Sequence, residues 1–196
     1  ATALISSSLL LVWDQTHALA AARDLAVSEV RLGTRGDYAE YVELRLGDGA
    51  TEVRVAGGDR KTLTPAGNYA DNNYIHHVGV FYKQGVGVSL SGCGNRASHN
   101  LIHDGPRWGI GFRGNNLLIE YNHIHHMMQQ LNDGAGVYTL GRQPGTVIRN
   151  NHIAKASGPT GVGIGFKETS DVTIEGNRIL YNAVGLYLDV SPYQPD

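Results

Sequence analysis

The phrase Asn100-Leu101-Ile102 recurs further along the chain as Asn122-His123-Ile124 and Asn151-His152-Ile153. Two more copies keep the Asn and the Ile: Asn73-Tyr74-Ile75 and Asn177-Arg178-Ile179. The successive asparagines are 27, 22, 29 and 26 residues apart. A recurring unit of this length is typical of a solenoid, in which each unit buries its apolar side only by stacking on its neighbours.

Residues aligned on these asparagines form columns that alternate between apolar and polar. Two positions after the Asn the residue is always Ile, and three positions before it stand Ala70, Ala97, Ile119, Ile148 and Ile174. The residue two positions before the Asn, next to this apolar column, is polar or charged in every copy, and these residues include Glu120, Arg149 and Glu175. An alternation with a period of two predicts strands with one buried face. We expect the outward charges to form a solvated ion-pair ladder.

The Asn column predicts an internal ladder of side-chain amides. Asn tolerates the left-handed backbone conformation of a bend, and its amide can pair with the coils above and below.

A second strand precedes each phrase and opens on a glycine. Aligned on Gly85, Gly109, Gly134, Gly161 and Gly185, its inward positions are Val86/Val88, Ile110/Phe112, Ala135/Val137, Val162/Ile164 and Leu186/Leu188. Short strands separated by Gly- and Asn-rich bends, with no amphipathic helix between them, predict an all-β parallel β-helix of about five to six coils.

Composition narrows the functional classes. The 196 residues suffice for one domain with a continuous core. The net charge is −2 and the chain has no basic run, so we expect no nucleic-acid partner. Cys93 is the only cysteine, which excludes an internal disulfide and zinc-ligand Cys spacing.

The two ends differ from the repeats. Residues 1–30 hold a short apolar run, and we expect either a cap over the open end of the solenoid or an export-related segment, too short to span a membrane. Residues 31–196 form the β-helix domain, with Tyr41–Leu46 and Thr51–Val55 as strands that feed the first coil. At the C-terminus two possibilities stay open: a truncated fragment, or a last coil closed by another molecule.

The outward face of the Gly-led strand is the first candidate site. The alignment places Gly87, Gly111, Gly136, Gly163 and then Tyr187 in one outward column. Its four glycines make a floor without side chains that a flat, extended ligand could approach. Beside it the alignment places Ser89, Arg113, Tyr138, Gly165 and Asp189, with Lys167 and Glu168 just beyond Phe166. Arg and Tyr beside such a floor suit a sugar chain, although glycine also simply permits tight coiling.

The bend after each Asn-x-Ile phrase is the second candidate site. It carries His76, His103 and His125 and, one residue later, His77, Asp104, His126 and Lys155. Stacked imidazoles beside Asp104 suit proton transfer or metal binding, or else they are a structural ladder. We expect no resident metal or cofactor; calcium and copper stay open, but no clear motif supports either.

Loops that leave this bend bring further candidates. Asp104 and Asp133 arise in successive loops, and two carboxylates that flank a groove are what glycoside hydrolysis needs. A lyase or epimerase would instead need a base and a cation, roles that His126, Tyr138, Arg113 and Lys167 could fill. The catalytic candidates are therefore Asp133, Asp104 and His126. The expected sugar-binding residues are Arg107, Trp108, Arg113, Tyr138, Arg142, Lys167, His103 and His125.

Several longer stretches resemble secreted bacterial right-handed parallel β-helix proteins, the single-stranded, pectate-lyase-like solenoids. The stretches are Gly57–Asn68, Asn100–Arg107, Gly114–His125 and Asp133–Tyr138, and the similarity covers roughly residues 30 to 190. The resemblance implies a secreted or periplasmic protein with a polysaccharide or oligosaccharide partner, either a carbohydrate-binding protein, a sugar hydrolase or a polysaccharide lyase. Relatives often carry Glu and Asp in the loop that here reads Gln129–Asp133, so Asp133 is retained and the Glu is absent.

The C-terminal part resembles a second group. Gly165–Asp171 and Gly185–Asp196 are similar to periplasmic β-helix proteins that mature the copper sites of nitrous oxide reductase. This resemblance implies a non-catalytic accessory role. The sequence leaves the oligomeric state open.

Overall fold

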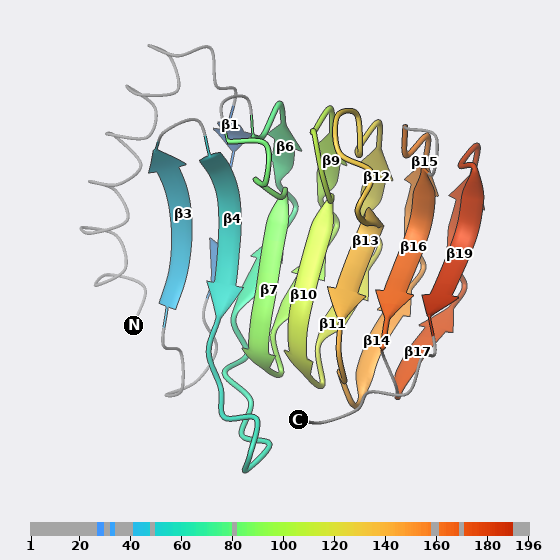
Figure 1. Ribbon diagram of the computed structural model, residues 1–196. Coiled ribbons are helices and arrows are strands. Elements are labelled where there is room, and N and C mark those ends of the chain that lie inside the picture. Colours follow the sequence, from blue (N-terminus) through green and yellow to red (C-terminus); the bar gives the residue numbers. More distant parts are fainter. Residues whose placement is uncertain are drawn as a thin grey trace.

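The computed structural model describes residues 27–29, 32–33, 41–47, 50–79, 82–157, 161–168 and 171–189. Within these residues the chain forms a parallel β-solenoid without helices, and three sheets make up its sides (Figure 1). Each coil contributes one strand to each sheet. The strands β4 to β18 make five coils, and β19 begins the next, in agreement with the expected five to six coils.

The seven-stranded sheet is continuous along the solenoid. In spatial order its strands are β3 (Tyr41–Gly47), β4 (Ala50–Ala56), β7 (Val88–Cys93), β10 (Ile110–Asn115), β13 (Ala135–Leu140), β16 (Val162–Lys167) and β19 (Val184–Asp189). All neighbours from β4 onwards are parallel.

The two six-stranded sheets complete the coil. One, called here the ion-pair sheet, contains β2 (Leu32–Gly33), β5 (Tyr69–Asp71), β8 (Arg96–Ser98), β11 (Leu118–Glu120), β14 (Thr146–Arg149) and β17 (Val172–Glu175). The other, the histidine sheet, contains β1 (Val27–Glu29), β6 (Tyr74–His76), β9 (Leu101–His103), β12 (His123–His125), β15 (His152–Ala154) and β18 (Arg178–Leu180).

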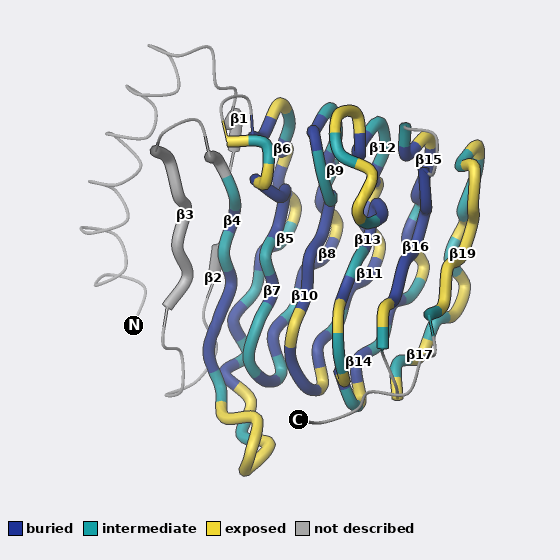
Figure 2. Tube along the Cα trace, viewed as in Figure 1, coloured by how far each residue is buried: buried dark blue, intermediate teal, exposed yellow. Residues whose placement is uncertain are grey.

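The two columns of the repeat lie inside the solenoid as predicted. The isoleucines of the Asn-x-Ile phrase pair in register across the histidine sheet, and the apolar column from Ala70 to Ile174 pairs in register across the ion-pair sheet. Most of these side chains are fully buried, and Ile174 and Ile179 near the last coil are partly buried (Figure 2). On the outside, Arg149 Nε donates to Glu120 Oε2 at 2.8 Å, which confirms an ion pair in that column.

The amide ladder is confirmed. Each Asn side-chain Nδ2 donates to Oδ1 of the Asn in the next coil, at 2.7 to 2.9 Å from Asn73 to Asn177. The left-handed residue, however, is the one before the ladder Asn: Asn72, His99, Tyr121, Asn150 or Gly176. The ladder asparagines therefore satisfy the buried amides beside the bend, and their neighbours supply the unusual backbone conformation.

The expected glycine floor is wrong. The strand register aligns Gly87, Gly109, Gly136, Gly163 and Gly185, so the sequence alignment was shifted by two residues in the two coils of β10 and β19. A Cβ on Gly109 or Gly163 would meet the Cγ2 of a core isoleucine and the carbonyl oxygen of the next glycine. This glycine column therefore permits close packing at a corner of the coil and offers no open floor to a ligand.

The first three strands pair differently from the rest. β1, β2 and β3 run antiparallel to β6, β5 and β4, so each sheet begins with a reversed strand. Most of the expected cap or export segment, residues 1–26, lies outside the described residues, as do residues 190–196. No described helix is long and apolar enough to cross a membrane.

Candidate functional site

The outer face of the seven-stranded sheet carries a mixed column of small and aromatic residues. The register places Ser89, Gly111, Tyr138, Gly165 and Tyr187 side by side on successive strands. Gly165 thus lies between two tyrosines, and a Cβ at Gly165 would be 3.2 Å from Cδ2 of Tyr138. One column further along, Arg113 pairs with Ser91, and Lys167 lies between Leu140 and Asp189.

Two successive loops meet beside this column. Arg107 Nη2 donates to Asp133 Oδ2 at 2.6 Å, and Trp108 Nε1 donates to the Asp133 carbonyl oxygen at 3.1 Å. The guanidinium carbon of Arg107 lies 4.0 Å from the Trp108 ring centroid. The Trp108 and Tyr138 rings are 4.5 Å apart at 37°. Trp108 is therefore held from several directions, and the cluster Arg107, Trp108, Asp133 and Tyr138 forms a rigid wall.

Backbone hydrogen bonds fix the two loops to each other. The amide nitrogens of Met128 and Gln129 donate to the carbonyl oxygens of Arg107 and Gly105, and that of Leu131 donates to Pro106. The side chains of Met127 and Met128 are fully buried beneath the loop. Asp133 is consequently carried by a packed loop, which is a suitable support for a binding or catalytic group.

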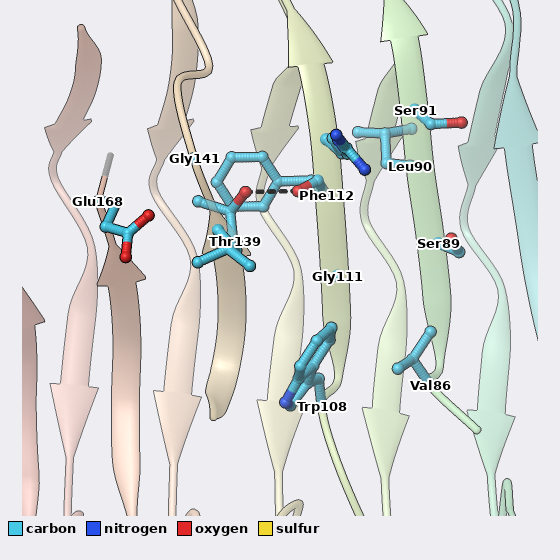
Figure 3. Close-up of a pocket in the computed structure, with 12 residues that line it drawn as sticks. Val86, Ser89, Leu90, Ser91, Trp108, Gly111, Phe112, Thr139, Gly141 and Glu168 are labelled. Atoms are coloured by element: carbon cyan, nitrogen blue, oxygen red, sulfur yellow. Dashed lines mark hydrogen bonds between the residues drawn. The ribbon is translucent and has the colours of Figure 1, made fainter. Parts of the chain in front are cut away.

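Two adjoining hollows lie on this face. The larger has a volume of about 830 Å³ and is lined by Arg107, Trp108, Asn132, Asp133, Gly134, Tyr138, Leu140, Val162, Gly165, Lys167, Ala183, Val184 and Tyr187. The smaller, shown in Figure 3, has a volume of about 370 Å³; its lining includes Ser89, Ser91, Trp108, Arg113, Leu140 and Glu168. Volumes of this size accommodate small-molecule ligands.

The phenol of Tyr138 lies among charged groups. Burial raises the pKa of Tyr138, the Asp133 carboxylate raises it further, and the Arg107 guanidinium opposes both. The phenol therefore stays protonated at neutral pH and is suited to donating a hydrogen bond rather than to accepting a proton. The Asp133 carboxylate, whose side chain is 59% exposed, is open to a ligand in the larger hollow.

The histidine sheet presents a separate group of ionisable residues. The rings of His76, His103 and His125 are stacked at centroid distances of 5.2 and 4.8 Å. In each of these three coils the strand histidine contacts the left-handed bend residue that follows it through Nδ1, at 2.7 Å: His76 with His77, His103 with Asp104, and His125 with His126. These six residues and Gln129, whose Nε2 donates to Asp104 Oδ1 at 3.1 Å, are called here the histidine cluster.

Burial and the neighbouring imidazoles disfavour protonation of His76 and His125 in this cluster. Burial, together with the neighbouring imidazoles of His103, His123 and His126, lowers the pKa of His125 to about 4. Burial and adjacent imidazoles also lower the pKa of His76. Although burial opposes the effect, hydrogen bonds from His103 and Gln129 hold the pKa of Asp104 below its usual value. Among the described residues, no three His, Cys, Asp or Glu side chains are arranged to hold a metal ion.

Comparison with known proteins identifies the fold family. The family model described as the right handed beta helix region matches residues 86–194, more than half of the chain. The chain belongs to the right-handed β-helix family. No curated protein and no solved structure matched the chain. Membership of this family confirms the expected handedness of the solenoid and assigns no particular activity.

In this β-helix the predicted site residues fall into two groups. Asp133, Arg107, Trp108, Tyr138 and Lys167 line the larger hollow, and Arg113 lines the smaller one with Trp108. Asp104, His103, His125 and His126 belong to the histidine cluster instead. Asp104 and Asp133 thus have different partners, and the structure does not join them into one carboxylate pair.

Arg142 lies outside both groups. Its Nη2 is 3.6 Å from Asp171 Oδ2, and its carbonyl oxygen accepts a hydrogen bond from Arg60 Nη2. Sequence reasoning missed Tyr187 and Leu140 as lining residues, since both depend on the strand register. A signal for Tyr187 existed, because it interrupts the supposed glycine column, but the shifted alignment placed it in the wrong context.

Proposed function

We propose that the larger hollow binds a segment of a polysaccharide or oligosaccharide and that Asp133 is the acid–base group that acts on it. The observation that carries this proposal is the Arg107–Asp133 ion pair, fixed beside Trp108 and Tyr138 at the rim of a hollow of about 830 Å³. The proposal implies a secreted or periplasmic location, where such polymers occur.

The lining chemistry matches a sugar better than an apolar ligand. A sugar ring has apolar C–H faces, which pack on aromatic rings, and hydroxyl groups, which need hydrogen-bond partners. Tyr187 is 48% exposed and offers such a ring face, and Asp133 and Lys167 offer charged hydrogen-bond partners. Gly165 lies between Tyr138 and Tyr187 in this lining, and a Cβ there would be 3.0 Å from Cβ of Ala135 and 3.2 Å from the Tyr138 ring.

Two reactions would use an exposed carboxylate in this position. In glycoside hydrolysis Asp133 would protonate the leaving oxygen or activate water, and a second carboxylate would be needed. In a lyase Asp133 would remove the proton from the sugar carbon that carries the carboxylate, and Arg107 or Lys167 would neutralise the charge that develops on that carboxylate. A carbon–carbon double bond would form as the glycosidic C–O bond at the adjacent carbon breaks, and the leaving oxygen would take a proton from Tyr138 or water. The protonated Tyr138 phenol would serve as a hydrogen-bond donor in either case.

A polysaccharide panel tests the proposal. Wild-type protein and Asp133→Asn are incubated with neutral and acidic polysaccharides, and reducing ends and the ultraviolet absorbance of unsaturated sugars are both measured. Reducing ends alone indicate a hydrolase, and both signals together indicate a lyase. If Asp133→Asn retains wild-type activity, the assigned role of Asp133 is wrong. If the wild type binds a polysaccharide in a gel-retardation assay without cleaving it, the protein is a binding module.

A second candidate function is the non-catalytic accessory role in copper-enzyme assembly. The feature behind it is the histidine cluster, because imidazole is a good copper ligand and the cluster's five histidines occur in three neighbouring coils. No three of these described side chains are already arranged to hold a metal ion. Copper(II) titration followed by visible absorption tests this role, with His103→Phe and His125→Phe as variants that keep the stacked rings. A wild-type titration without a saturable band removes its chemical basis.

A further inference from the structure

A phenol, an imidazole and a carboxylate form a chain of hydrogen bonds on the outer face of the histidine sheet. Tyr74 begins β6, and His103 ends the neighbouring strand β9 (Figure 1). The hydroxyl oxygen of Tyr74 is 3.0 Å from His103 Nε2, and His103 Nδ1 is 2.7 Å from Asp104 Oδ2. The register pairs Tyr74 with Leu101, so the phenol reaches diagonally to the imidazole two residues further along β9.

The two hydrogen bonds fix the position of the proton on His103. An ionised carboxylate only accepts, so His103 Nδ1 donates to Asp104 and Nε2 is left as an acceptor. The Tyr74 hydroxyl therefore donates to His103 Nε2. Asp104 is itself held by Gln129, whose Nε2 donates to Oδ1 at 3.1 Å. His103 is consequently placed to remove the proton of Tyr74, and the Asp104 carboxylate stabilises the imidazolium that forms.

The phenol is accessible, and the base behind it is shielded. Tyr74 is 39% exposed, but the His103 side chain is only 12% exposed. The rings of His76 and His125 stack on His103 at centroid distances of 5.2 and 4.8 Å. The Tyr74 ring is also 4.6 Å from the His76 ring. His103 is therefore confined to one orientation between two rings, and Tyr74 is far more open to a solute than its base is.

A second tyrosine provides an internal comparison. Tyr121 is 49% exposed, and its ring stacks on that of His99 at a centroid distance of 5.2 Å and an angle of 7°. His99 Nδ1 is 3.0 Å from Asp71 Oδ1, so this tyrosine also lies beside a His–Asp pair. Within the described part of the chain, however, the Tyr121 hydroxyl makes no hydrogen bond to His99. Tyr121 thus shares the surroundings of Tyr74 but lacks the contact with the base.

We propose that Tyr74 is a nucleophile that accepts an acyl group from an activated ester, with His103 as its base and Asp104 as the residue that positions His103. The phenol oxygen attacks the carbonyl carbon of the ester while its proton moves to His103 Nε2. The bond between the carbonyl carbon and the leaving group then breaks, and the leaving group takes the proton from His103. The product is an acylated Tyr74, and His103 is neutral again.

The chemistry of a phenol selects the class of acyl donor. An acylated tyrosine is an aryl ester, so the transfer is favourable only when the leaving group is about as acidic as a phenol, whose pKa is about 10. Aryl esters and thioesters meet this condition, and esters of simple alcohols do not. The described lining of the two hollows contains none of Tyr74, His103 and Asp104, so this inference does not depend on the proposed function.

Acetylation by p-nitrophenyl acetate tests the inference. The visible absorbance of nitrophenolate measures the rate, and peptide mass spectrometry of the full chain locates the acetyl groups. At about pH 7 we expect Tyr74 to be acetylated at least about tenfold faster than Tyr121. His103→Phe keeps a ring in the stack and should remove this advantage, whereas the matched control His99→Phe should leave it unchanged. Equal acetylation of the two tyrosines in the wild type, or release of the first equivalent of nitrophenolate by Tyr74→Phe at the wild-type rate, would overturn the inference.

A pH series separates base catalysis from an effect of exposure or packing. A phenol without a base reacts as the phenolate, so its acetylation slows by about tenfold for each unit of pH below about 10. The ratio of Tyr74 to Tyr121 acetylation should therefore be large at about pH 7 and small at about pH 10. Asp104→Asn tolerates the left-handed backbone at this position and should lower the ratio at the lower pH only. A ratio that stays constant over the pH series, in protein shown by circular dichroism to be folded, would mean that His103 does not act as the base.

Discussion

The indole nitrogen of Trp108 occupies the space in which a side chain at Gly134 would lie. Gly134 directly follows Asp133, and Trp108 Nε1 donates to the Asp133 carbonyl oxygen, so the glycine lets the indole approach this loop closely. The position of Trp108 in the wall therefore depends on the absence of a methyl group at Gly134.

Replacing Gly134 by Ala should displace Trp108 and weaken glycan binding by about tenfold or more, with a smaller effect on stability, because the site is half-exposed. Tryptophan fluorescence should report the displacement. The matched control is Gly185→Ala, where the nearest atom to the added Cβ is 3.9 Å away. Wild-type affinity in Gly134→Ala would show that the position of Trp108 does not matter for the ligand.

The glycine column at the corner of the coil gives a stability prediction. A Cβ on Gly109 would be 2.5 Å from Cγ2 of Ile124 and 2.8 Å from the carbonyl oxygen of Gly136. Because both neighbours belong to the packed core, Gly109→Ala should lower the free energy of unfolding by about 1–3 kcal/mol. Denaturant titration measures this difference, and Gly185→Ala again serves as the control. Equal stabilities of the two variants would contradict the assigned packing role.

The sequence predicted the periodic part of this structure and failed where the loops set the register. The Asn-x-Ile phrase is short and recurs with the same internal spacing, so its columns could be aligned without the structure. The Gly-led strands follow loops of different length and contain glycines at alternate positions, such as Gly134 and Gly136. Such a strand keeps its inward and outward faces after a two-residue shift, so the side-chain pattern cannot distinguish the two registers.

The candidate site shows the same limit. Asp133, Arg107, Trp108 and Tyr138 were predicted and lie together, because loop residues near one strand end remain neighbours whatever the register. Asp104 was predicted to join Asp133, but it contacts the preceding residue, His103, at 2.7 Å. That local contact arises from the left-handed backbone of Asp104, which the sequence did not reveal.

The internal ladder should be sensitive to the loss of a single amide donor. Asn122 Nδ2 donates to Asn151 Oδ1 and to the Ala97 carbonyl oxygen, and Asn122 is fully buried. Asn122→Asp keeps the shape of the side chain but places an oxygen against two acceptors, Asn151 Oδ1 and the Ala97 carbonyl oxygen. The free energy of unfolding should therefore fall by about 1–3 kcal/mol. Asn150→Asp is the control, because Asn150 is exposed and Asp tolerates its left-handed conformation. Chemical denaturation compares the two, and a similar small loss in both would argue against the ladder as a major source of stability.

The two predicted carboxylates should differ in their effect on cleavage. Asp133→Asn keeps an acceptor for Arg107 and removes the acid–base group, so the cleavage rate should fall by about a hundredfold or more. Asp104→Asn should change the rate by only a few fold, because Asp104 contacts His103 and Gln129 and lines neither of the two hollows. Initial rates on the polysaccharide identified by the panel measure both effects. A large loss in Asp104→Asn with intact stability would mean that the histidine cluster takes part in the reaction.

The histidine cluster should make the folded state less stable in mild acid. The pKa of His125 falls from 6.5 to about 4 on folding, so the folded state favours the neutral ring. This contribution is fully present above about pH 6.5 and is lost as the pH falls toward 4, because the unfolded chain then binds a proton that the folded chain does not. The lowered pKa values of His76 and His123 act in the same direction. After allowance for partial solvent screening, we expect His125 to account for about 1 kcal/mol.

His125→Phe provides the test of this pH dependence. Phenylalanine keeps an aromatic ring stacked on His103 but cannot be protonated. The fall in stability between about pH 7 and pH 4.5 should therefore become shallower. Denaturant midpoints at a series of pH values measure the slope for the wild type and the variant. An unchanged slope would show that His125 is protonated equally easily in the folded and unfolded chains, and the stacked ring would then have no role in the response to acid.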